Sequence, residues 1–229
     1  MASGEDHDLA QQLAQVAREL LGAGDVPQTL QRMVDLAVET IEGCDHAGLS
    51  LVVGGQIETP AQNDRIPEIV DGIQNATGQG PCTDAIREHE VFETGDLAAE
   101  DRWPRFSAQV VERTGVHSAL AMRLFTEHDT MGALNLYAEA TDAFGDDDRS
   151  VASIFAAHAA VALRAAQRQE QLIDAIETRD IIGQAKGIIM TRSGVDDQQA
   201  FEVLRDASNR MDTKLREVAR RIVQHQRER

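Results

Sequence analysis

Cationic side chains that could contact phosphate groups are gathered in the last quarter of the sequence. Residues 177–229 hold 11 basic and 9 acidic residues, whereas residues 1–176 hold 11 basic and 30 acidic residues. A chain with a formal net charge of −17 repels polyanions, so contact with nucleic acid requires a local basic surface of this kind. The alternative is an ordinary solvated face. The candidate phosphate-binding residues are Arg179, Lys186, Arg205, Lys214, Arg216, Arg220 and Arg221.

Two cysteines, Cys44 and Cys82, offer a second kind of chemistry. They could form a redox pair or hold a ligand, or they could be small apolar residues of the core, which is common for free cysteine. The seven histidines show no metal-ligand spacing, and the sequence has neither a phosphate-binding glycine loop nor a Gly-x-Ser-x-Gly motif. We therefore expect no metal, no cofactor and no enzymatic activity.

Three short amphipathic helices are predicted to position the cationic residues. Glycine tolerates the left-handed conformation that follows a helix, so the first helix is expected to end at Ser193-Gly194. Asp196 is the expected N-cap of the second helix, and Asp212 is that of the third. Short turns between such helices predict a three-helix bundle. Its expected core is Ile181, Ile182, Ala185, Ile188, Ile189, Ala200, Phe201, Leu204, Ala207, Leu215, Val218, Ala219, Ile222 and Val223.

Two glycines, Gly183 and Gly187, lie inside the first of these helices. Each costs about 1 kcal/mol of helix stability relative to alanine, so their presence needs a reason. One explanation is that a ligand approaches the backbone at these positions. The other is that the glycines allow the helices of the bundle to pack closely.

The stretches RDIIGQAKGIIM, AFEVLRDAS and KLREVARRIV closely resemble the ANTAR domain, an RNA-binding module of transcription antiterminators. The resemblance implies a bundle that binds paired hairpins in nascent mRNA leaders, so that a terminator hairpin does not form. Gln184 and Asn209 could then read bases in the hairpin loops. The family often has Asn where this chain has Asp212, and a negative charge there could weaken phosphate contact. The family hallmarks fall on Ala185, Lys186, Gly187, Ala200, Phe201, Lys214 and Ala219.

The first two thirds of the sequence alternate between helical and strand-like periodicity. Strands are expected at residues 47–53, 56–61, 91–94, 118–125 and 131–139, with a turn at Gly54-Gly55. Helices are expected at residues 7–22, 27–42, 66–75 and 83–88, and from residue 102. The stretches GQGPCTDAI, DLAAEDRWPRF and VHSALAMRLF…MGALNLYAEA resemble a GAF domain of the kind found upstream of ANTAR domains in actinobacterial proteins. The resemblance implies a sensory sheet with a pocket on one face and no particular ligand.

From Phe144 the sequence continues as one long helix into the bundle, without Pro or Gly between Gly145 and Gly183. The first half is expected to pack on its own sheet. Beyond Arg164 an apolar repeat of about 3.5 residues predicts a parallel coiled coil between two protomers. The repeat is Val151, Ile154 or Phe155, His158, Val161 or Ala162, Ala165, Arg168, Leu172 and Ile176. The predicted domains are a GAF sensor with an N-terminal helix at residues 1–165, and a coiled-coil extension with the ANTAR domain at residues 166–229.

Together these features predict an α+β protein in which a GAF sandwich is joined by a long continuous helix to a three-helix ANTAR bundle. The predicted function is that of a signal-responsive, RNA-binding transcription antiterminator. It is expected to be a cytoplasmic homodimer whose GAF domain can hold a small-molecule ligand. No apolar segment reaches the roughly 18 residues of a membrane span, and the N-terminus lacks a signal-peptide core.

Three other functions compete with this one. The main alternative is a ligand or redox sensor that acts through protein-protein contact without RNA binding. An enzyme of the methionine sulfoxide reductase type would need a group of closely placed cysteines, and the chain has two. DNA binding would need a recognition helix with clustered base-reading residues, which the sequence does not offer.

Overall fold

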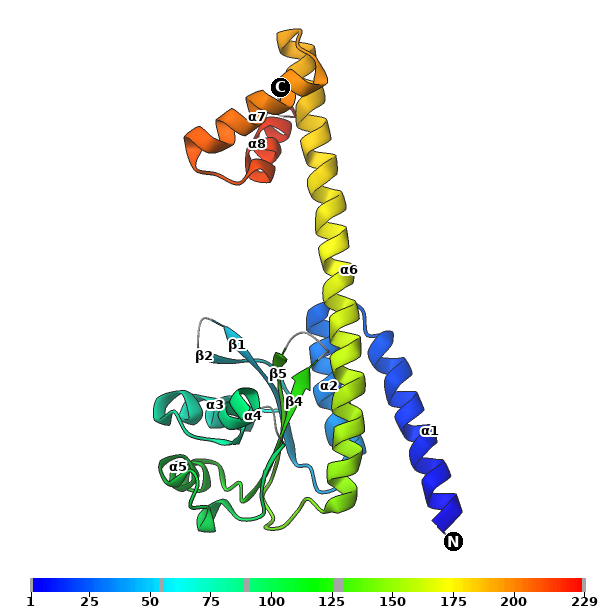
Figure 1. Ribbon diagram of the computed structural model, residues 1–229, viewed down its shortest axis with the longest axis vertical. Coiled ribbons are helices and arrows are strands. Elements are labelled where there is room, and N and C mark those ends of the chain that lie inside the picture. The colour runs from blue at the N-terminus through cyan, green and yellow to red at the C-terminus, as the bar shows by residue number, and fades with distance from the viewer. Residues whose placement is uncertain (1, 54–55, 89–90, 126–129, 228–229) are drawn as a thin grey trace. The chain divides into compact units, whose positions relative to one another are not determined.

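The computed structural model describes residues 2–53, 56–88, 91–125 and 130–227 (Figure 1). The chain forms two compact units, Met1–Gln167 and Arg168–Arg229. The first unit combines helices with one sheet and the second is helical, which confirms the predicted α+β class. Among the described residues, no helix has both the length and the apolar character that crossing a membrane requires.

A five-stranded antiparallel sheet forms the centre of the first unit, with the strand order β2-β1-β5-β4-β3. Its strands are β1 (His46–Val53), β2 (Gln56–Gln62), β3 (Phe92–Thr94), β4 (Ser118–Phe125) and β5 (Thr130–Ala138). The predicted strands are therefore confirmed at nearly the expected bounds. The predicted turn at Gly54-Gly55 lies outside the described residues.

Helices cover both faces of this sheet (Figure 1). The helices of this unit are α1 (Ala2–Leu21), α2 (Val26–Thr40), α3 (Ile66–Thr77), α4 (Pro81–Glu88), η1 (Leu97–Ala99), α5 (Pro104–Thr114) and the first half of α6 (Asp146–Ser193). α2 and α6 lie against one face, and α3, α4 and α5 lie on the other (Figure 1). Asp25 and Gln28 form a capping box that begins α2, and Gly78, at φ 64°, ends α3.

Two apolar cores lie on the two sides of the sheet. Leu120, Met122 and Leu136 pack with Phe155 and Leu163 of α6, so the first half of α6 packs on its own sheet as predicted. The second core joins α3, α5 and the sheet around residues that include Val70, Ile73, Trp103, Phe106 and Tyr137. The Trp103 indole Nε1 donates a hydrogen bond of 2.6 Å to Asp84 in α4, which satisfies its polar edge.

The second unit consists of the end of α6, α7 (Asp197–Met211) and α8 (Leu215–Arg227). α6 ends at Ser193, Gly194 follows at φ 66°, and Asp196 caps α7 together with Gln199, as the sequence predicted. The core is formed by Ala185, Ile189, Ala200, Leu204, Val218, Ala219 and Val223, with Ile181, Ile182, Ile188, Ala207, Leu215 and Ile222 partly buried against it.

Two predictions about this unit are wrong. Phe201 was expected in the core, but 38 % of its surface is exposed, because it lies at the edge of the apolar stripe that Ala200 and Leu204 bury. Asp212 was expected to cap the third helix. It instead ends α7 in a left-handed conformation, with φ 47° and ψ 44°, and α8 begins only at Leu215.

Candidate nucleic-acid interface

Two adjoining hollows lie on the surface of the helical unit. The α6–α7 hollow has a volume of about 650 Å³ and is lined by Ala175, Thr178, Arg179, Asp180, Ile182, Gly183, Lys186 and Phe201. The α8-start hollow has a volume of about 480 Å³ and is lined by Gln171, Asp174, Ala175, Thr178, Ile182, Lys214, Leu215 and Arg216. The hollows share Ala175, Thr178 and Ile182, so they form one continuous surface. We call it the cationic surface because four of the seven candidate cations line it, namely Arg179, Lys186, Lys214 and Arg216.

Two of these cations already have carboxylate partners. Lys186 Nζ lies 2.6 Å from Asp197 Oδ1 in the first turn of α7. Arg216 Nη1 lies 2.9 Å from both carboxylate oxygens of Asp174, which ties the start of α8 to α6. Among the described residues, no salt bridge involves Arg179 or Lys214. Surface ion pairs contribute only about 0–1 kcal/mol, so a phosphate group can compete for the paired cations.

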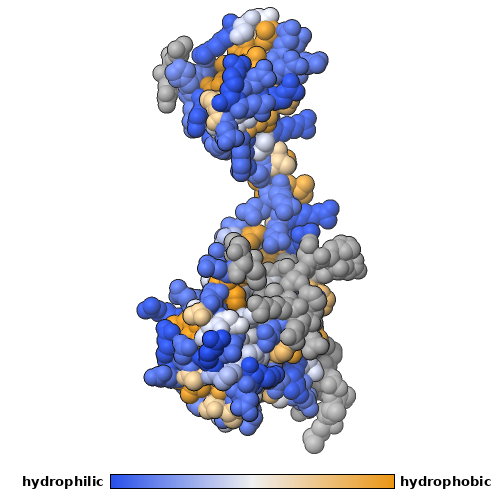
Figure 2. All heavy atoms as spheres, turned by 60° about the vertical axis from the view of Figure 1, so that its left-hand side comes forward, coloured by the Kyte–Doolittle hydropathy of each residue, from blue (hydrophilic) through white to orange (hydrophobic). Residues whose placement is uncertain are grey.

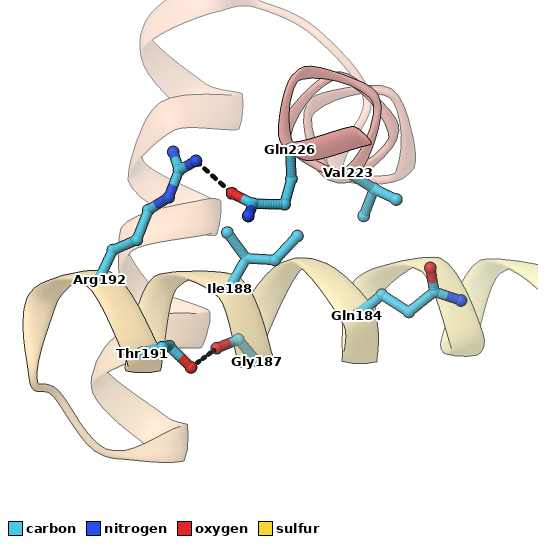
Figure 3. A pocket seen from close by; sticks show the side chains of 7 residues that line it. All are labelled: Gln184, Gly187, Ile188, Thr191, Arg192, Val223 and Gln226. Atoms are coloured by element: carbon cyan, nitrogen blue, oxygen red, sulfur yellow. Dashed lines mark hydrogen bonds between the residues drawn. The ribbon is translucent and has the colours of Figure 1, made fainter. Parts of the chain in front are cut away.

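A third hollow, the α6–α8 hollow, has a volume of about 540 Å³ (Figure 3). It is lined by Gln184, Gly187, Ile188, Thr191, Arg192, Val223 and Gln226. Arg192 donates a hydrogen bond to Gln226 Oε1 across this hollow (Figure 3). The sequence prediction missed Arg192, although it follows Gln184 and Ile188 at intervals of four residues and therefore shares their side of α6. The predicted base-reading Gln184 thus does not share a hollow with the four cations.

The remaining candidate residues lie elsewhere on the helical unit. Arg205, Asn209, Arg220 and Arg221 are exposed, and none of them lines one of these three hollows. Arg205 lies one turn after Phe201, on the same side of α7. Arg220 donates a hydrogen bond to Glu217 and thereby holds the pKa of Glu217 below its usual range. The structure therefore brings together only part of the predicted set.

The two glycines of α6 open onto the hollows. Gly183 lines the α6–α7 hollow and Gly187 lines the α6–α8 hollow. A Cβ atom added to either residue would meet no atom within 4 Å beyond the adjacent residues and the backbone of its own helix. Close packing within this chain therefore does not require these glycines. Of the two explanations left open by the sequence, approach of another molecule to the α6 backbone is the one that this geometry favours.

Four exposed apolar residues form a stripe along α6. Ile154, Val161, Leu172 and Ile176 are 42 %, 60 %, 60 % and 61 % exposed, and their spacing places them on one side of the helix. Figure 2 likewise shows hydrophobic residues at the surface among hydrophilic ones. Exposed apolar residues arranged in this way are typical of an interaction site.

A buried polar cluster lies in the first unit, beneath α3 and α4. Asp71 accepts hydrogen bonds from Ser50, Thr59 and Gln74, and Asn135 donates one to Ser50. Burial raises the pKa of Asp71, since no cation compensates its charge among these partners. Asn135 Oδ1 and the Tyr137 hydroxyl are buried nearby and have no hydrogen-bond partner among the described residues. Each of these two atoms therefore has unused hydrogen-bonding capacity, of the kind that a buried water molecule or a polar ligand commonly satisfies.

The two cysteines are free and buried. Cys44 belongs to the core between the sheet, α2 and α6, whereas Cys82 lies in α4 beside the buried polar cluster. Burial raises the pKa of each thiol to about 12, so little thiolate is present at neutral pH. In addition, no three His, Cys, Asp or Glu side chains are grouped as metal ligands within the described ranges.

Comparisons with known families match both units. A family model described as GAF domain matches residues 23–164, and one described as ANTAR domain matches residues 170–223. A comparison with curated proteins finds no match.

Solved structures with the fold of the first unit include GAF domains of phosphoenolpyruvate-protein phosphotransferases. The domain from Acinetobacter is 14 % identical, with a TM-score of 0.56 over 71 % of this chain and 97 % of that chain. The domain from Coxiella burnetii is 16 % identical, with a TM-score of 0.56 over 71 % and 96 %. Free methionine-R-sulfoxide reductase from Neisseria meningitidis is 15 % identical, with a TM-score of 0.55 over 70 % and 91 %. At these identities the likeness concerns the fold alone.

Proposed function

Because the chain belongs to the GAF domain family and carries an ANTAR domain over residues 170–223, we propose that it is a signal-responsive transcription antiterminator. Both domains are regulatory rather than enzymatic. The ANTAR unit binds paired hairpins in the leader of a nascent mRNA, and a terminator hairpin then cannot form. The GAF domain receives the signal that controls this binding. The role requires access to nascent RNA, and we therefore also propose a cytoplasmic location.

The cationic surface is the observation that carries this proposal. Arg179, Lys186, Lys214 and Arg216 converge on it within a chain whose formal net charge is −17. Cations that neutralise phosphates supply most of the affinity of nucleic-acid binding, and they make that affinity fall with salt. Arg205, Arg220 and Arg221 extend the basic character around the unit, and Gln184 and Asn209 offer amides to unpaired bases.

Pairing of two chains through α6 is the second part of the proposal. The exposed stripe through Ile154, Val161, Leu172 and Ile176 supports it, because a parallel coiled coil would bury these side chains. Two ANTAR units per dimer would match the two hairpins of one target.

A small polar ligand in the GAF domain is the third part of the proposal. Support comes from Asn135 Oδ1 and the Tyr137 hydroxyl, which are buried without a partner among the described residues. A ligand or an ordered water that bonds both atoms would remove the cost of leaving them unpaired.

Lys214 is the residue with which we test RNA binding. Lys214→Ala should weaken binding of a two-hairpin RNA and lower the slope of log K against log salt by about 1, because one phosphate contact is lost. Fluorescence anisotropy at several salt concentrations measures both quantities. Arg210→Ala is the matched control, since Arg210 is exposed on α7 and lines none of the three hollows.

Two results would count against the proposal. Equal salt slopes for the Lys214 variant and the unmodified chain would exclude this surface as the phosphate contact. If the unmodified chain bound no two-hairpin RNA, the alternative of a sensor acting through protein-protein contact would take its place.

A further inference from the structure

Phe201 is the one Phe, Tyr or Trp residue that the sequence contains after Phe155. Its ring lines the α6–α7 hollow, and 38 % of the residue remains exposed. The buried core of the helical unit, to which Phe201 does not belong, is aliphatic. An aromatic side chain that is partly exposed contributes less free energy to stability than a fully buried one. We therefore expect Phe201 to have a role outside the core.

The surroundings of this ring combine charge with open backbone. Arg179 and Lys186 line the same hollow, and Arg205 follows Phe201 by one turn of α7. Gly183 also lines the hollow, and the space beyond its backbone is empty for at least 4 Å around an added Cβ. The hollow therefore offers a ring for stacking, cations beside it and open space at the Gly183 backbone.

We propose that the α6–α7 hollow holds one unpaired base of an RNA hairpin loop, stacked on Phe201. The adjoining phosphates lie at Lys186 and Arg179. Grooves that bind single-stranded nucleic acid combine these elements, an aromatic platform for the base and cations for the backbone. This inference rests on the proposed RNA-binding function and extends it to a residue that the sequence assigned to the core.

The composition of the hollow favours RNA over a second copy of the chain as its occupant. A partner helix would bury apolar surface, and the long apolar stripe of α6 already provides for that. The α6–α7 hollow instead has two cations and Asp180 along its lining. Asp197 pairs with Lys186, and a phosphate must displace this carboxylate, which at the surface costs little.

Phe201→Leu in the full chain is the test, because leucine keeps an apolar side chain and removes the stacking face. The affinity for a two-hairpin RNA should fall about tenfold, which corresponds to about 1.4 kcal/mol. The salt slope should stay unchanged, since stacking releases no counterions, whereas Lys186→Ala should lower the slope by about 1. Phe201→Tyr keeps the ring and should bind like the unmodified chain. Val203→Ala is the control, because Val203 is 49 % exposed on another side of α7.

A second measurement locates the base. The same RNA is prepared with 2-aminopurine at each loop position in turn, and its fluorescence is recorded with and without protein. One position should be quenched by the unmodified chain and by the Tyr variant, and much less by the Leu variant. Circular dichroism and sedimentation confirm that each variant is folded and has the same mass as the unmodified chain.

The outcomes separate this inference from the proposed function. If the unmodified chain binds the RNA and Phe201→Leu binds equally well, the stacking platform is wrong and the proposed function stands. If Phe201→Leu is folded but lowers the mass in sedimentation, the ring belongs to a contact between copies, and the inference is overturned. If the unmodified chain does not bind the RNA at all, both fail together.

Discussion

Asp212 allows the chain to turn at the end of α7, and its charge at the same time destabilises that helix. It adopts φ 47° and ψ 44° at the end of α7, a left-handed conformation that Asn and Asp tolerate better than other non-glycine residues. Its negative charge lies at the negative end of the helix dipole, which is unfavourable by about 0.3–1 kcal/mol. It is also two residues before Lys214 of the cationic surface.

Asp212→Asn should therefore stabilise the protein by about 0.5 kcal/mol, because the charge is removed and the backbone conformation is kept. It should also raise RNA affinity modestly at low salt, since a negative charge near Lys214 disappears. Urea unfolding and anisotropy measure the two effects. Asp206→Asn, in the interior of the same helix, should give neither gain. Equal stabilisation by both variants would mean that the position at the helix end is irrelevant.

At the scale of elements, hydrophobic period predicted most helices and strands almost to their bounds, because apolar residues repeat at the period of the element even where both faces are buried, as in β4. It also predicted the Asp196 cap and the Gly194 stop. It failed for Phe201 because exposure at the edge of an apolar stripe depends on where the neighbouring helix crosses. It failed for Asp212 because a three-residue connection places the same side chain near the end of one helix and the start of the next, and Asp suits both.

The candidate site could be predicted only in part. Charge counting located the cationic unit, because a basic segment stands out in an acidic chain. The grouping of Lys186 with Lys214 depends on how α7 and α8 return to α6, which the period of one helix does not determine. The hypothesis that Cys44 and Cys82 form a redox pair stays a prediction. Both thiols are buried, and burial raises the pKa of each to about 12.

The free energy of unfolding should depend on pH through Asp71, which lies in α3 where this helix packs on the sheet. Its pKa is raised by burial, so the native state binds a proton at pH values where the unfolded chain, with a pKa near 3.9, does not. The free energy of unfolding should therefore fall as pH rises from about 4 through the raised pKa. Asp71→Asn should lack this part of the slope, and urea unfolding from pH 4.5 to 8 measures it.

For Asp71→Asn, the prediction concerns only the slope of the unfolding free energy against pH and not the absolute stability. An Asn amide would place a donor near the Gln74 Nε2 donor, so the absolute stability can fall even though a buried charge is removed. Comparing the two proteins at each pH cancels contributions from other groups, such as Glu100, whose pKa Arg102 lowers to about 2. Parallel curves for the two proteins would show that Asp71 is not the source of the slope.

At the scale of the whole molecule, net charge and oligomeric state should both affect RNA binding. Residues 1–176 carry a formal charge of −19 and residues 177–229 carry +2, so most of the chain repels the RNA that the helical unit is proposed to bind. A dimer offsets this, because the second hairpin of a target then binds at a high effective concentration. Such linkage raises affinity by about 10²–10⁴ without a new contact. RNA binding should therefore depend on the apolar stripe of α6, a helix present in both units.

The double variant Leu172→Glu and Ile176→Glu tests this dependence. Both side chains are about 60 % exposed in the single chain, so the change should not disturb its fold, whereas two acidic side chains facing their copies should prevent a coiled coil. Sedimentation should show a monomer in place of a dimer. The affinity for a two-hairpin RNA should fall at least about a hundredfold, to about that for a single hairpin, while single-hairpin binding stays the same. Ile173→Glu is the control: it is a similar apolar-to-acid change on an exposed residue beside the stripe, and it should leave the mass unchanged.

A double variant that remains dimeric would refute the stripe as the interface. Equal loss of single-hairpin binding would instead mean that the acidic side chains act on the RNA surface itself.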